Sequence, residues 1–132
     1  MQNNETENNA IQKNSFEGNV CDLTYLNETM SGKKPLIREI MDIFLTQIPE
    51  ELQFIKEGIM KENYAMIKKY SHTMKSSVSI MGITLLNPIL REMEDLGTAA
   101  KDIEKIKQLN NSLNLICEQA LNEIEKVKHN YA

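Results

Sequence analysis

One histidine and its helical neighbours are the residues of this chain best suited to chemistry. A helix turns by about 100° per residue, so His72 lies on one side of the run 67–81 and the apolar positions lie on the other. Those apolar positions are Ile67, Tyr70, Met74, Val78 and Met81. Lys68 and Lys75 stand one turn on either side of the histidine. The neighbouring residues that leave room for a partner are small: Ala65, Ser76 and Ser79.

An exposed imidazole between two lysines suits the exchange of a phosphoryl group with a partner protein. An unperturbed imidazole is largely neutral near pH 7, so one ring nitrogen can act as a nucleophile without a separate base. Lys75 can neutralise phosphate oxygens as a point charge, and Lys68 is a weaker candidate for the same task. The alternative for His72 is an ordinary solvated histidine on a helix surface. The alternative for Lys75 and Lys68 is a solvated cationic face, which we prefer for Lys68.

Length and composition indicate one helical domain. The 132 residues include 41% hydrophobic residues but only 5% aromatic residues, with no Trp. A chain of this length can bury a real core. Its abundant Leu, Ile and Met favour helices packed on helices over strands. We therefore expect a single all-α domain.

Charge, cysteine content and hydropathy exclude several classes of function. The net charge is −4, and no stretch concentrates Lys and Arg, so we expect no nucleic-acid partner. Cys21 and Cys117 fit no metal or redox spacing, so we expect two reduced thiols and no metal site. No apolar run is long enough to span a membrane, and the N-terminus has no secretory core. These features predict a cytoplasmic protein without a membrane partner.

The N-terminal segment differs from the rest of the chain. Residues 1–19 are rich in Asn, Gln and Glu, which predicts a disordered polar tail. The folded domain is then expected over residues 20–132. It begins with a short helix from Leu23 to Met30, which Asp22 can cap.

Four longer helices are expected after this short one. They run from Pro35 to Met60 with a break or kink at Pro49, from Asn63 to Gly82, from Thr84 or Asn87 to Gly97, and from about Lys101 to Lys128. Short connections force neighbouring helices to be antiparallel. The predicted fold is an all-α, antiparallel up-down four-helix bundle with a short extra N-terminal helix.

The residues around His72 form a longer pattern. It reads His72-x-Met74-Lys75-Ser76-Ser77-Val78, then Gly82 ten residues after the histidine, Leu86, and the pair Met93-Glu94. This pattern resembles that of the histidine phosphotransfer (HPt) domain, which is His-x-Leu-Lys-Gly-Ser-Ser/Ala, then Gly, then a helix ending in Leu/Ile-Glu/Gln. The run 35–45 is also similar to the family's helix before a proline break, and the resemblance covers Val20 to the C-terminus. Two departures are Ser76, where the family usually has Gly, and Ile83, where Ala is commoner.

The resemblance implies a phosphocarrier in a multistep two-component phosphorelay. Nε2 of His72 would attack the aspartyl phosphate of a receiver domain, and Lys75 would stabilise the phosphate. Glu94 would accept a hydrogen bond from Nδ1 and so orient the ring. The receiver would bring Mg²⁺, so the chain itself would need no cofactor. The sequence has no glycine-rich nucleotide-binding box, so we expect no kinase activity.

The expected partners are receiver domains of response regulators or of hybrid sensor histidine kinases. The candidate contact residues are Lys68, Ser76 and Ser79 beside the histidine, and Leu26 and Met30 on the first helix. Because Ser76 replaces the family's glycine, a different class of protein is the alternative: a helical adaptor that binds a receiver or sensor kinase without accepting phosphate. We expect a monomer, because a complete bundle has its own core, and a stand-alone protein rather than the terminal module of a longer hybrid kinase.

Overall fold

The computed structural model describes residues 19–132, so the predicted polar tail lies outside the described residues except for Asn19. The helices are α2 (Thr24–Thr29), α3 (Lys34–Met60), α4 (Tyr64–Ile80), α5 (Leu86–Ala99), α6 (Ile103–Val127) and the 3₁₀ helix η1 (Lys128–Tyr131). No strand occurs in residues 19–132. Within the same residues, no helix is both long and apolar enough to cross a membrane.

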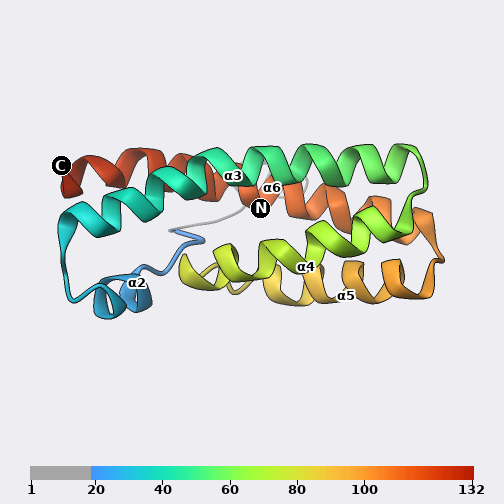
Figure 1. The fold of residues 1–132 in the computed structure, drawn as a ribbon, viewed down its shortest axis with the longest axis horizontal. Helices are drawn as coiled ribbons and strands as arrows, with labels where there is room; N and C mark the ends of the chain where they lie inside the picture. Colours follow the sequence, from blue (N-terminus) through green and yellow to red (C-terminus); the bar gives the residue numbers. More distant parts are fainter. Residues whose placement is uncertain (1–18) are drawn as a thin grey trace, which may run out of the picture.

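Four long helices form a bundle. In Figure 1, α4 and α5 lie side by side in the lower half of the view, and α3 and α6 lie above them. Helix α6 packs against both α3 and α5, which closes the bundle. The short α2 lies beyond the C-terminal end of α4 (Figure 1). The predicted all-α bundle with a short extra N-terminal helix is therefore confirmed.

Apolar residues at helical spacing fill the interior of the bundle. The largest fully buried side chains are Leu26, Ile37, Met41, Ile48, Ile55, Ile67, Met74, Met81, Ile83, Leu86, Leu90 and Met93. Each side chain of this size contributes about 1.5–3 kcal/mol when it is removed from water. Ile106, Leu113 and Ile124 of α6 are fully buried in the same core. This common core fixes the rotation of every long helix, and therefore decides which residues face solvent.

The ends of α4 are fixed by one cap and one glycine. Oδ1 of Asn63 accepts a hydrogen bond from the Met66 amide at 3.1 Å, as a helix N-cap does. After α4, Gly82 has a φ of +65°, a region that residues with a Cβ rarely adopt. A Cβ on Gly82 would also overlap the carbonyl oxygen of Asp22. The Asp22 amide donates to the Met81 carbonyl at 3.1 Å, so the N-terminal segment is joined to the end of α4.

Of the break or kink expected at Pro49, the break is not present. Helix α3 continues from Lys34 to Met60 with Pro49 inside it. Proline removes one helical hydrogen bond, which locally disfavours a helix. However, Ile48 and Ile55 are both fully buried, so core packing on either side of the proline holds α3 together.

The expected ends of α5 were also wrong. Neither Thr84 nor Asn87 caps this helix with its side chain, and the cap position is Leu85. At the other end, α5 continues past Gly97 to Ala99, and Gly97 is buried within the helix. Gly97 is therefore a packing residue rather than the end of the helix.

Candidate functional site

His72 lies in the middle of α4, with its side chain on the outer surface. Its side chain is 67% exposed. On the opposite face of the same helix, Ile67, Met74 and Val78 are fully buried. The core therefore fixes α4 in the rotation that the sequence predicts, and His72 faces solvent where a partner can reach it.

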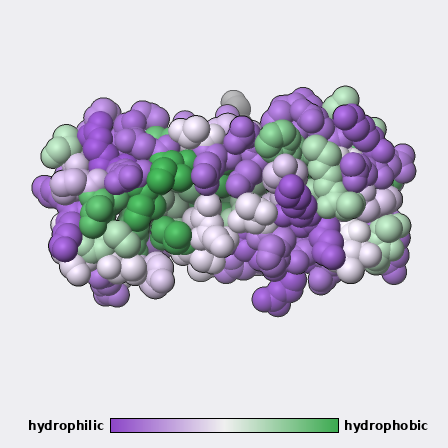
Figure 2. Space-filling view, in the orientation of Figure 1, coloured by the Kyte–Doolittle hydropathy of each residue, from purple (hydrophilic) through white to green (hydrophobic). Residues whose placement is uncertain are grey.

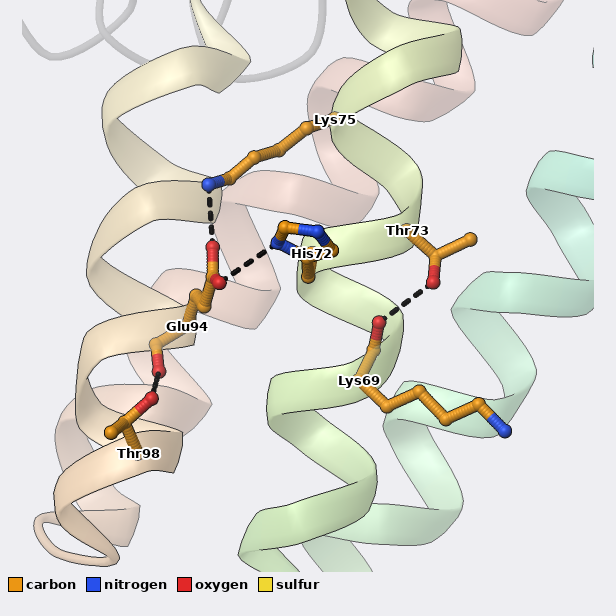
Figure 3. Close-up of polar contacts among 6 residues, drawn as sticks. All are labelled: Lys69, His72, Thr73, Lys75, Glu94 and Thr98. Carbon is orange, nitrogen blue, oxygen red and sulfur yellow. Dashed lines mark hydrogen bonds and ion pairs between the residues drawn. The ribbon is translucent and has the colours of Figure 1, made fainter.

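A carboxylate on the neighbouring helix contacts the ring of His72. Oε2 of Glu94, on α5, lies 2.9 Å from Nδ1 of His72. The other oxygen, Oε1, lies 2.5 Å from Nζ of Lys75. Figure 3 shows Glu94 facing His72 across the space between α4 and α5, with Lys75 reaching to the same carboxylate. The expected contact between Glu94 and Nδ1 is thus present, and Lys75 is held by Glu94 as well.

The protonation of Glu94 sets the direction of this hydrogen bond. The hydrogen bond from Lys75 is the main effect that lowers the pKa of Glu94, and the contact with His72 lowers it further, although partial burial opposes both. Glu94 is therefore ionised near neutral pH and can only accept hydrogen bonds. Consequently Nδ1 of His72 carries a proton and donates a hydrogen bond to Glu94. In the neutral ring, this leaves the lone pair on Nε2.

An open hollow lies beside the ring. It is lined by Ala65, Lys68, Lys69, His72, Thr73 and Glu94. Lys68 is exposed at this hollow, and Ser76 and Ser79 are exposed further along α4. The predicted small and cationic neighbours of His72 are therefore all on the surface of α4.

Two hydroxyl groups near the site were not predicted. The Thr98 hydroxyl donates to the Glu94 carbonyl at 2.9 Å, and the Thr73 hydroxyl donates to the Lys69 carbonyl at 2.8 Å (Figure 3). Lys69 also lines the hollow, and its ammonium lies 5.3 Å from the centre of the Tyr70 ring. The adjacent lysines 68–69 were the signal in the sequence that could have indicated the position of Lys69. Adjacent residues on a helix point about 100° apart, so two neighbouring lysines cover two different sides of α4.

One of the two docking residues expected on the first helix is buried. Leu26 is only 1% exposed and belongs to the core, so its place on a docking surface was wrongly expected. Leu26 faces the interior of the bundle. A six-residue helix is too short for its sequence to show which side is buried without the neighbouring helices. Met30 is half-buried and packs against the core. The exposed large apolar side chains near this end of the bundle include Leu36 and Ile43 on α3.

The other reactive groups lie away from the histidine. Cys21 and Cys117 form no disulfide. Burial, and to a smaller extent Glu51, raise the pKa of Cys117 to about 12. Among residues 19–132, no three His, Cys, Asp or Glu side chains are grouped so that they could hold a metal ion. The side chains in mutual contact at the site are His72, Lys75 and Glu94.

The fold and the site together are those of a helical bundle that presents an oriented histidine to solvent. The family model of the Hpt domain matches residues 39–127, which include His72, Lys75 and Glu94 and make up more than half of the chain. The chain belongs to the Hpt domain family. Comparison with curated proteins and with solved structures gave no match.

Proposed function

We propose that this chain relays a phosphoryl group between receiver-domain aspartates through a phosphohistidine at His72. Hpt domains serve phosphorelays as phosphocarriers. The observation that carries the proposal is the 2.9 Å contact between Nδ1 of His72 and Glu94, on a side chain that is otherwise exposed. Because Nδ1 is engaged by Glu94 and the side chain is exposed, Nε2 is the ring nitrogen that would attack an approaching aspartyl phosphate.

The transfer step needs little from the chain itself. The lone pair of Nε2 forms a bond to phosphorus, the bond from phosphorus to the aspartate oxygen breaks, and the carboxylate of the receiver leaves with the electron pair. The ring becomes positively charged, because Nδ1 keeps its proton. Glu94 then faces a cation, and this favours the phosphorylated state. The receiver supplies Mg²⁺, so no cofactor is held by this chain.

The position of Lys75 supports a change of partner during this step. In the unphosphorylated protein its ammonium lies on Oε1 of Glu94. Lys75 is one helical turn from His72, so a phosphoryl group on Nε2 would compete with Glu94 for the ammonium. We propose that Lys75 moves to the phosphoryl oxygens once the new bond has formed.

We propose that a receiver covers His72 and also contacts an apolar face of α3. Leu36, Ile40 and Ile43 are spaced by four and three residues, so they lie on one face. Leu36 is 43% exposed and Ile43 is 47% exposed. Figure 2 shows apolar surface gathered in the half of the molecule that contains the N-terminal part of α3. Exposed apolar groups of this kind often mark contact sites for proteins.

The proposed carrier is not a kinase and works in the cytoplasm. Two unpaired cysteines are compatible with a reducing compartment. Phosphoryl groups would enter from a receiver and leave to a receiver, because the sequence has no nucleotide-binding box. Partners would be response regulators or hybrid sensor kinases that contain a receiver.

The test is phosphoryl transfer from a panel of phosphorylated receiver domains of the source organism, with His72→Gln as the control. We expect an acid-labile, base-stable phosphate on the wild-type chain and none on the variant. Tight binding of a receiver without transfer, unchanged in His72→Gln, would instead support the adaptor. In that case Ser76, which stands where the family usually has glycine, is the first residue to exchange.

A further inference from the structure

Gly97 lies where α5 packs closely against the backbone of α4. It is three residues after Glu94 on α5, and it faces Lys68, which is four residues before His72 on α4. A Cβ on Gly97 would lie 3.0 Å from the amide nitrogen and from the Cβ of Lys68, and 3.1 Å from its Cα. Two of these three atoms are backbone, so no side-chain rotation can relieve the contact.

The spacing at Gly97 controls the spacing at the histidine. These distances are shorter than ordinary van der Waals contact, so a Cβ at this position must move the two helices apart by a few tenths of an ångström. Three residues along a helix span only about 4.5 Å, so Glu94 would move with the same segment. The contact between Glu94 and His72 is 2.9 Å long. The same displacement would lengthen it to about 3.2 Å or more, the upper end of the usual range for this hydrogen bond.

We propose that Gly97 is a positioning residue for His72: by letting α5 approach the backbone of α4 at Lys68, it brings the Glu94 carboxylate within reach of Nδ1. Glu94 then selects the ring form that carries its proton on Nδ1. The effect on transfer rests on the proposed function, because orientation matters for transfer only if His72 accepts the phosphoryl group. The effect on the ring itself does not rest on it.

A second buried glycine offers a matched control. Gly58, on α3, also packs against α4, and a Cβ there would lie 3.2 Å from Cγ1 of Ile67 and 3.3 Å from Cβ of Met66. Gly58→Ala therefore crowds α4 from the side of α3, away from Glu94. Both substitutions strain an interface of the bundle, but only Gly97→Ala strains the interface that holds the carboxylate.

The experiment is ¹⁵N NMR of the full chain, which reports which ring nitrogen of His72 carries the proton, with His129 as the internal reference. We expect the wild type and Gly58→Ala to keep the proton on Nδ1 when the ring is neutral, and Gly97→Ala to shift it towards Nε2. With the small donor phosphoramidate, we expect Gly97→Ala to accept phosphate up to about fivefold more slowly, because it acts only through the contact of Glu94 with His72. Gly58→Ala should react at the wild-type rate.

An unchanged proton position in Gly97→Ala would overturn the inference, and so would an equal shift in Gly58→Ala. Glu94→Asp tests the same reach without straining the helices, because it retracts the carboxylate by one carbon–carbon bond, about 1.5 Å. A wild-type proton position in Glu94→Asp would overturn the inference even if Gly97→Ala did not fold. Failure of the wild type to accept phosphate would refute the proposed function alone, since the NMR result would still decide the role of Gly97.

Discussion

Replacing Glu94 by Gln tests how the charge of one carboxylate supports transfer at His72. Glutamine has nearly the same size, but it offers one acceptor oxygen instead of two and carries no charge. In the wild type, Oε2 accepts from His72 and Oε1 pairs with Lys75. The variant can keep only one of these partners, and its NH₂ group would then face the other donor.

The magnitude follows from the geometry and the exposure of the site. Hydrogen bonds to charged groups contribute about 1.5–3 kcal/mol and neutral ones about 0.5–1.5 kcal/mol. His72 is 67% exposed, so solvent screens the difference and places it at the lower end, near 1 kcal/mol. The ring becomes cationic in the transition state, so losing the charge of Glu94 raises the free energy of that state and slows transfer. We expect phosphoryl transfer to Glu94→Gln to be about fivefold slower than to the wild type.

The assay is rapid-quench transfer from a radiolabelled phosphorylated receiver. Glu92→Gln is the matched control, because Glu92 is exposed on the same helix and two residues along a helix point about 200° apart. The reasoning would be refuted if Glu94→Gln reacted as fast as the wild type, or if Glu92→Gln were slowed equally.

Three further predictions, two of them with a control variant, test the bundle and its proposed docking face. Burial, followed by the charge of Glu50, raises the pKa of Glu51, whose Oε1 is buried without a hydrogen-bond partner. A raised native pKa means that stability is lost as pH rises through it, so Glu51→Gln should melt higher than the wild type at pH 7. The gain should vanish below pH 4 in calorimetry, and a lower melting point at pH 7 would contradict it. Gly82→Ala should lower the free energy of unfolding by about 2 kcal/mol or more, from a left-handed φ and the overlap with Asp22. Gly32 has a φ of +68° with open space around a Cβ, so Gly32→Ala should lose only the free energy of unfolding that comes from the left-handed backbone. Urea titrations measure both losses, and equal losses for Gly32→Ala and Gly82→Ala would argue against the overlap with Asp22. Ile43→Glu should weaken receiver binding about tenfold or more by calorimetry, whereas Met60→Glu at the other end of α3 should not; equal affinities for the two variants would exclude this face.

The sequence predicts the bundle and the exposure of His72 because both depend on periodicity. Buried Ile67, Met74 and Val78 recur at helical spacing, and this spacing fixes the opposite face as well. Glu94 was reached only through the family pattern. Its distance to His72 depends on how two helices pack, and periodicity within one helix carries no information on that distance.

The errors share one physical cause. Pro49 and Gly97 are local signals for the end of a helix, yet both lie inside helices. Local preference is outweighed where neighbouring helices bury the same segment, and Gly97 is needed because the backbone of Lys68 lies so close. Leu26 shows the same effect, since the bundle decides which face of α2 is buried.

The most direct test of the account is the position of the phosphoryl group. The ¹⁵N-labelled chain would be phosphorylated by a receiver and examined by ³¹P and ¹⁵N NMR, which report the nitrogen bonded to phosphorus. The account predicts one phosphoryl group, on Nε2 of His72, with a proton retained on Nδ1 beside Glu94. A phosphoryl group on Nδ1, on His129 or on no histidine would contradict it.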